Sequence, residues 1–150
     1  MRSLLLASLA MVWGAAALAD PLPGPIPAEA TRIIDGDTVS VRATIWLGHT
    51  VETNVRLAGI DAPELRARCP SERVLAERAR DRLAALLDDR SLVLKDVRPD
   101  AFGGRVVARL MDAEGGDPAA ILVAEGLARS YDGSGGRAGW CPELSVSGAG

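Results

Sequence analysis

Residues 38–57 read TVSVRATIWLGHTVETNVRL, and this stretch decides the fold. Apolar and polar residues alternate from Val39 to Leu47 and again from Val51 to Leu57, which is typical of two half-buried β-strands. Gly48 lies between the two runs and turns the chain. The pattern predicts a hairpin with one face in a core, and it places Arg56 on the opposite, more polar face.

The rest of the chain adds further strands and two helices to this hairpin. We expect strands over 92–97 and 105–111, a helix over 71–89 from its apolar stripe, and a second helix capped by Asp117 with Pro118 at its first position. The expected order is three strands, helix, two strands, helix. This order predicts an α+β fold, mainly β, built as a five-stranded OB-type barrel with two helices.

The two ends of the chain do not fit this domain. Residues 1–19 combine Arg2, an apolar run and a small-x-small end, which predicts a signal peptide; a membrane anchor is the alternative. We expect residues 20–29 to form a proline-rich leader, 30–132 the domain, and 133–150 a flexible tail tethered through Cys141. We therefore expect a periplasmic or secreted monomer without stable membrane association.

The charge argues against tight binding of duplex nucleic acid. The formal net charge is −3, and it becomes −4 without residues 1–19, because Arg2 is their only charged side chain. Affinity for a polyanion comes largely from Lys and Arg, which release counterions from it. Either a bound cation supplies positive charge locally, or nucleic acid is held weakly.

The chain has two cysteines, Cys69 and Cys141. An even number of cysteines in an exported protein favours a disulfide, and a buried pair of free thiols is the alternative. A zinc site is excluded because the single histidine, His49, and two isolated cysteines lack any zinc-ligand spacing.

Acids and arginines in three short segments carry the chemistry. The segments are Ile34-Asp35-Gly36-Asp37-Thr38, then Arg56 followed by Asp61-Ala62-Pro63-Glu64, then Gly104-Arg105. Metal-assisted phosphodiester hydrolysis needs hard oxygen ligands, a base for water and fixed positive charge for the phosphate. Each residue alone also has a plainer interpretation: a turn for Asp-Gly-Asp, a solvated loop acid for Glu64, and a surface salt bridge for either arginine.

Three motifs in this order resemble the staphylococcal-nuclease (thermonuclease) family. They are residues 33–38, residues 55–64 and residues 102–108, within a similarity that covers roughly residues 30 to 132. The resemblance implies Ca²⁺ held by Asp37, Asp61 and the main-chain carbonyl of Ala62, with Asp35 behind these ligands. It also implies that Glu64 is the general base and that Arg56 and Arg105 bind the phosphate.

Two departures from the family pattern lie near Arg105. Phe102 stands where family members often have a tyrosine, and an extra glycine separates it from Arg105. Tyr131, the only tyrosine, either stacks on a base of the substrate or packs on the barrel. We expect Trp46 and Trp140 to be packing residues.

Together these features predict an exported, Ca²⁺-dependent phosphodiesterase that acts on DNA and RNA with low sequence specificity. The rival hypothesis is a noncatalytic OB-fold module that binds nucleic acid or a protein partner. A related hydrolase of small phosphate esters is a third hypothesis, and it suits a chain in which acidic residues outnumber basic ones.

Overall fold

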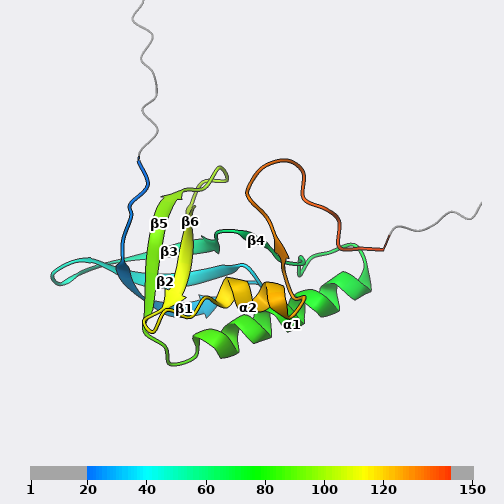
Figure 1. Cartoon of the computed structure of the whole chain (residues 1–150), viewed down its shortest axis with the longest axis horizontal. Coiled ribbons are helices and arrows are strands. Elements are labelled where there is room, and N and C mark those ends of the chain that lie inside the picture. The colour runs from blue at the N-terminus through cyan, green and yellow to red at the C-terminus, as the bar shows by residue number, and fades with distance from the viewer. Residues whose placement is uncertain (1–19, 143–150) are drawn as a thin grey trace, which may run out of the picture.

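Five long strands close into a β-barrel in the computed structural model, which describes residues 20–142 (Figure 1). The strands are β1 (Ile26–Ile33), β2 (Thr38–Trp46), β3 (His49–Leu57), β5 (Leu92–Pro99) and β6 (Arg105–Asp112). They follow the order β1-β2-β3-β6-β5, in which β3 and β6 run parallel and all other neighbours antiparallel. The prediction of a five-stranded OB-type barrel is confirmed.

Two helices pack beside the barrel, as predicted. The long helix α1 (Pro70–Leu87) and the short helix α2 (Pro118–Ala124) lie next to each other along one side of it (Figure 1). The side chain of Asp117 accepts a hydrogen bond from the N–H of Ala120 at 3.2 Å, which caps α2. A two-stranded sheet of β4 (Ile60–Asp61) and β7 (Arg129–Ser130) lies outside the barrel.

The core consists of the inward faces of the strands and the apolar stripe of the helices. Buried residues alternate with more exposed ones over Val39–Ala43 of β2, Val55–Leu57 of β3 and Ala108–Leu110 of β6. The largest fully buried side chains are Leu57, Leu83, Leu92, Leu94, Leu110, Leu122, Val39, Val41 and Val55, together with Pro63. Two of them, Leu83 and Leu122, join the helices to the barrel core.

β1 begins at Ile26, earlier than the expected leader allows. Pro27 lies within this strand and pairs with Val93 of β5, whereas pairing with β2 begins only at Ala28. At Pro27 the strand thus has one neighbour instead of two, and the missing N–H of proline is tolerated at such a position. Proline-rich composition alone was therefore a poor guide to where the domain starts.

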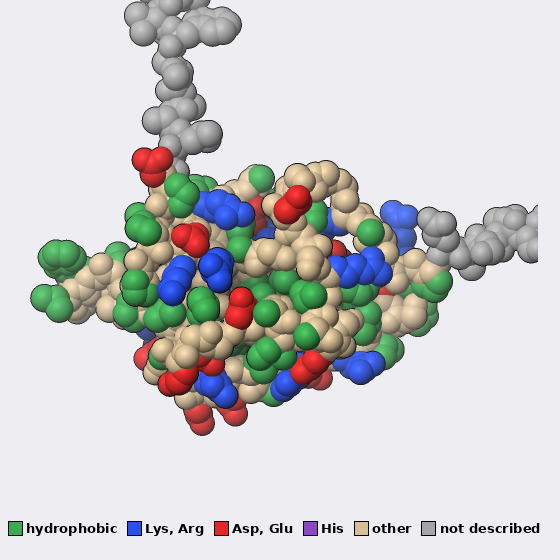
Figure 2. All heavy atoms as spheres, viewed as in Figure 1, with side chains coloured by type: hydrophobic (Ala, Val, Ile, Leu, Met, Phe, Trp, Pro, Cys, Tyr) green, Lys and Arg blue, Asp and Glu red, His purple; other side chains and the backbone are tan. Residues whose placement is uncertain are grey.

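The tip of the β2–β3 hairpin is apolar and exposed. Trp46 is 72% exposed and Leu47 87% exposed, so the expectation that Trp46 packs in the fold is wrong. The space-filling view shows hydrophobic side chains gathered at this projecting tip, on the left of the molecule (Figure 2). The alternation of the two strands continues into the tip, but the tip extends past the body of the barrel, so no second layer covers it.

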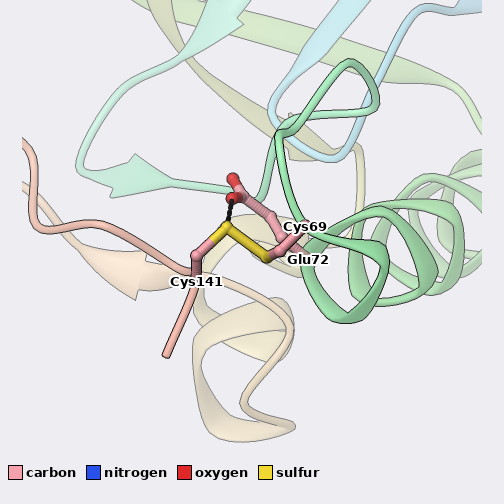
Figure 3. A group of neighbouring side chains, drawn as sticks. All are labelled: Cys69, Glu72 and Cys141. Carbon is pink, nitrogen blue, oxygen red and sulfur yellow. Dashed lines mark hydrogen bonds between the residues drawn. A yellow bond between two sulfur atoms is a disulfide. The ribbon is translucent and has the colours of Figure 1, made fainter. Parts of the chain in front are cut away.

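Cys69 and Cys141 form the predicted disulfide (Figure 3). The bond joins the residue before α1 to the C-terminal end of the described chain, with a Cα–Cα distance of 5.9 Å. Glu72 of α1 is buried beside it, and its Oε2 lies 3.2 Å from the sulfur of Cys141. The C-terminal segment is therefore fixed to the start of α1.

The expected signal peptide, residues 1–19, lies outside the described residues, as do residues 143–150 of the expected tail. Across residues 20–142, neither helix combines the length and the apolar composition needed to cross a membrane.

Candidate active site

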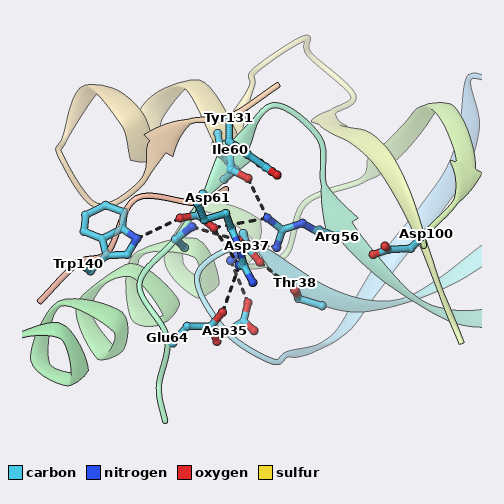
Figure 4. Close-up of polar contacts among 12 residues, drawn as sticks. Asp35, Asp37, Thr38, Arg56, Ile60, Asp61, Glu64, Asp100, Tyr131 and Trp140 are labelled. Atoms are coloured by element: carbon cyan, nitrogen blue, oxygen red, sulfur yellow. Dashed lines mark hydrogen bonds and ion pairs between the residues drawn. The ribbon is translucent and has the colours of Figure 1, made fainter. Parts of the chain in front are cut away.

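Two buried carboxylates, Asp37 and Asp61, lie close to Arg56 at the ends of strands from two different sheets (Figure 4). Asp37 immediately precedes β2, and Asp61 ends β4. Their side chains are only 6% and 8% exposed. The main chain holds the two segments together, because the N–H of Leu57 donates to the carbonyl of Asp37 at 2.8 Å.

Arg56 connects the two carboxylates from the polar face of β3. Its Nη1 donates to Asp37 Oδ2 at 2.8 Å, its Nη2 lies 3.7 Å from Asp61 Oδ1, and the same Nη2 donates to the carbonyl of Ile60 at 3.2 Å. The guanidinium is 13% exposed. The buried negative charge is thus partly balanced by a fixed positive group, as a stable buried arrangement of charges requires.

Ala62 and Asp35 complete the surroundings of Asp37. The N–H of Ala62 donates to Asp37 Oδ2 at 3.0 Å, and the N–H of Asp37 donates to Asp35 Oδ1 at 3.0 Å. Burial, and then the neighbouring negative charge of Asp37, raises the pKa of Asp35 to about 6. Asp35 therefore contacts Asp37 through the main chain, behind the two buried carboxylates.

Glu64 follows Asp61 on the same loop but is much more open to solvent. Its side chain is 56% exposed, and its N–H donates to Glu72 Oε1 at 3.1 Å, which ties the loop to α1. The carboxylate of Glu64 is therefore accessible to solvent while the main chain that carries it is fixed.

The C-terminal segment supplies two residues that the sequence analysis did not place here. Arg137 Nη1 donates to Asp61 Oδ1 at 2.9 Å and to Glu64 Oε1 at 3.2 Å. Trp140 Nε1 donates to Asp61 Oδ2 at 3.1 Å, so Trp140 is a polar partner of the site as well as a packing residue. The segment was expected to be tethered through Cys141, and Arg137 and Trp140 add further attachments. The one local signal for this placement was the position of Trp140 beside Cys141.

Arg105 does not join this cluster in the described structure. It pairs with Asp100 from the preceding strand connection, and its guanidinium lies 5.4 Å from the centre of the Phe102 ring. Gly103 and Gly104 both have positive φ angles, of 51° and 69°, so the extra glycine belongs to a tight loop that only glycine adopts easily. Asp100 was not anticipated, because no pattern in the sequence marks it as the partner of Arg105.

A cavity of about 490 Å³ nevertheless unites Arg56 and Arg105. Tyr131 and Arg137 also line this cavity, and the hydroxyl of Tyr131 donates to the carbonyl of Gly135 at 3.1 Å. A larger cavity of about 740 Å³ lies beside β1 and the end of α1, away from the acids and arginines described above. The smaller cavity is therefore the one that suits the predicted chemistry.

Asp37 and Asp61 are the two buried acids of this cluster, so a metal bound between them would have two acidic ligands instead of three or more. Within residues 20–142, no three of the predicted acids have their oxygens within 4.8 Å of one another; the one group of three that does is Cys69, Glu72 and Cys141. Both sulfurs of that group are in the disulfide and have no thiolate to offer. Asp37 and Asp61 offer carboxylate oxygens, the ligand type that a hard cation prefers, and a cation there would compete with Arg56 and Arg137 for them.

The sequence model of a protein family described as "Staphylococcal nuclease homologue" matches residues 54–144. The match includes Arg56, Asp61, Glu64 and Arg105, whereas Asp35 and Asp37 precede it. A curated protein from Escherichia coli, "Protein ParB", is 37% identical over 101 residues, which are 64% of this chain and 51% of that protein. The chain thus spans about half the length of this curated relative.

Proposed function

The chain belongs to the staphylococcal nuclease homologue family, and we propose from this that it is an exported, Ca²⁺-dependent endonuclease that hydrolyses DNA and RNA with little sequence preference. The observation that carries the proposal is the pair of buried carboxylates, Asp37 and Asp61, that Arg56 connects beside a cavity shared with Arg105. Such a pair of acids has no role in a plain barrel core, where apolar residues would be more stable.

In this proposal Asp37, Asp61 and the main-chain carbonyl of Ala62 hold the cation. Carboxylate and carbonyl oxygens are the ligands that Ca²⁺ prefers, and the family is metal-dependent in general. When bound, Ca²⁺ supplies positive charge that polarises the phosphate and stabilises the charge of the transition state. Asp35 holds the loop in place because its side chain accepts a hydrogen bond from the N–H of Asp37.

The other proposed roles follow from exposure and from the cavity. Glu64 accepts the proton of the attacking water, for which its exposed carboxylate beside Asp61 is suited. Arg56 and Arg105 bind phosphate oxygens, because a guanidinium presents two N–H groups in a fork that matches two such oxygens. Tyr131 lines the same cavity and offers a ring on which a base can stack.

The compartment and the domain boundaries belong to the same proposal. We propose that residues 1–19 are removed on export and that the mature protein acts as a monomer in the periplasm or outside the cell. The disulfide between Cys69 and Cys141 supports an oxidising compartment. With a net charge of −3, the whole chain should hold nucleic acid weakly.

A noncatalytic OB-fold module that binds nucleic acid or protein is the second candidate. One observation favours it: Arg137 engages both Asp61 and Glu64, so the proposed metal ligand and the proposed base are paired with a side chain of the same protein. A binding module needs the arginines but not a residue that activates water.

The substitution Glu64→Gln separates the two candidates. It preserves shape but removes the base, so Ca²⁺-dependent cleavage of a labelled oligonucleotide should fall on the order of 10²-fold or more while affinity hardly changes. Rates with EDTA in place of Ca²⁺ serve as the control. Wild-type protein with no turnover above the variant, across DNA and RNA substrates, would refute the nuclease and leave the module.

A further inference from the structure

Residues 131–141 form a strap that is attached at both ends and contacts the candidate active site through Arg137 and Trp140; Figure 1 shows this segment as the orange loop that follows β7. At the first end, β7 pairs with β4 and the N–H of Tyr131 donates to the carbonyl of Gly59 at 2.9 Å. At the second end, Cys141 is bonded to Cys69. The guanidinium of Arg129 lies 3.8 Å from the centre of the Trp140 ring, which fixes the end of the strap further.

Arg137 lies between these attachments, where its side chain contacts the acidic residues of the site and also lines the cavity. One nitrogen, Nη1, contacts Asp61 and Glu64, yet the side chain is 42% exposed and lines the 490 Å³ cavity. The hydrogen bond to Asp61 raises the pKa of Arg137 above its usual value, so the side chain stays charged. Glycines flank it at Gly135, Gly136 and Gly139, and these permit backbone adjustment within the strap.

The cavity is positively charged although the whole chain is acidic. Four arginines and two aspartates are the charged residues that line it: Arg56, Arg98, Arg105, Arg137, Asp100 and Asp132. The two aspartates are engaged, Asp100 with Arg105 and Asp132 with the hydroxyl and N–H of Ser134. Arg137 thus accounts for one of four positive charges at the place where a polyanion would have to bind.

The carboxylate of Asp61 cannot bind the guanidinium of Arg137 and a divalent cation equally strongly at the same time. A cation bound to this carboxylate would repel the guanidinium and take its strongest partner. Because the strap is held at both ends, a released Arg137 stays at the cavity instead of leaving for solvent. A phosphate group is the partner that a freed guanidinium binds best there, since it offers charge and two acceptor oxygens.

We propose that Arg137 is a third phosphate-binding arginine of the candidate active site, held by Asp61 and Glu64 until a cation displaces it toward the nucleic acid. The proposal rests on the proposed function, because it needs the cation site at Asp61. In this proposal the strap contributes to substrate binding. It adds the guanidinium of Arg137 to a cavity in which β3 supplies Arg56 and β6 supplies Arg105 as the other proposed phosphate-binding residues.

The test measures binding instead of turnover, with an oligonucleotide whose phosphorothioate linkages resist cleavage, so that both acids that hold Arg137 stay in place. A labelled single-stranded oligonucleotide is titrated with Ca²⁺ and with EDTA, against Arg137→Gln, Arg137→Lys and Trp140→Phe. With Ca²⁺, Arg137→Gln should weaken binding on the order of tenfold, the loss of one charge-assisted hydrogen bond. The slope of log affinity against log salt should fall by about 0.7, the value for one phosphate contact on a single strand. With EDTA the substitution should have little effect.

The controls separate a contact with phosphate from a change in the strap. Arg137→Lys should recover most of the salt slope, and Trp140→Phe, which removes a hydrogen bond of the strap without changing charge, should leave the slope unaltered. Equal losses with Ca²⁺ and EDTA, or no loss in either, would overturn the proposal. Calorimetry of Ca²⁺ binding to the wild-type protein distinguishes a failure of this proposal from a failure of the proposed function. If the protein does not bind Ca²⁺, the proposed function is wrong; if it binds Ca²⁺ but Arg137→Gln has no Ca²⁺-dependent effect, only the role of Arg137 is wrong.

Discussion

At the scale of single residues, Asp100 is the partner that orients Arg105. Its burial opposes ionisation, but the hydrogen bonds from Arg105 and from the N–H of Phe102 outweigh this, and the pKa of Asp100 lies below its usual value. The pair therefore contributes stability that is complete above the unfolded pKa, near 3.9, and is lost as the pH falls through the lower folded pKa.

The substitution Asp100→Asn tests this pair. The variant should be less stable than the wild type by about 1 kcal/mol at pH 7, and the difference should shrink as the pH falls below about 4. Urea unfolding at pH 7 and pH 3 measures both values. A difference that stays constant between these pH values would show that the charge of Asp100 contributes nothing. Cleavage by the variant should also fall, because Arg105 loses its orientation.

Local patterns predicted the residues that lie at strand ends, but not their partners. Alternation in residues 51–57 placed Arg56 on the polar face of β3, and the structure has it between Asp37 and Asp61. The positions of Arg137 and Trp140 depend on the path of a glycine-rich segment that has no periodicity. Their side chains reach the site through tertiary contacts and a disulfide, which a local pattern does not encode.

At the scale of elements, the close packing of the 35–37 loop on α1 explains the glycine of the Asp-Gly-Asp motif. A Cβ added to Gly36 would lie 2.7 Å from the Cβ of Ala79 and 2.8 Å from the Cβ of Ala62. The loop that carries Asp37 therefore rests directly on the helix and on the segment after Asp61. Gly36 is therefore needed because a side chain would not fit there, as well as because the chain turns at this position.

Gly36→Ala should therefore destabilise the protein by roughly 1–3 kcal/mol, the usual effect of overpacking, and should weaken Ca²⁺ binding as Asp37 shifts. Denaturant unfolding and calorimetry measure the two effects. Gly139→Ala is the matched control, because a Cβ there meets nothing within 4 Å. If both variants unfold at the same denaturant concentration, the loop does not rest on the helix as described.

The elements with clear periodicity were predicted well, and the others were not. Strands β2, β3, β5 and β6 and helix α1 begin and end within two residues of the predicted positions, and α2 begins at the predicted Pro118. β1 begins inside a proline-rich segment because Pro27 occupies a position with a single neighbouring strand. β4 and β7 contain two residues each, too few for any pattern to mark them.

At the scale of the whole molecule, the disulfide joins the two halves of the chain across 72 residues. On the chain-entropy argument a loop of this length stabilises the folded state by about 4 kcal/mol. The double variant Cys69→Ser/Cys141→Ser should lose most of this free energy of unfolding, as measured by urea unfolding. A reductant should lower the urea midpoint of the wild type to that of the variant. Unaltered stability in both samples would mean that the bond constrains the unfolded chain little. The pairing itself was predictable, because two cysteines can pair in only one way within a chain.

The order of strands in the barrel has a consequence for the kinetics of folding. Ile26 pairs with Leu94, and Asn54 with Arg105, so two of the strand pairs that close the barrel join distant parts of the chain. Closing such long loops costs entropy before any contact repays it, and domains of this topology fold slowly, on the order of milliseconds to seconds. A chain leaving the ribosome has no partner for the open edges of β1 and β3 until β5 and β6 have emerged. During that interval the unpaired edges make the nascent chain prone to aggregation.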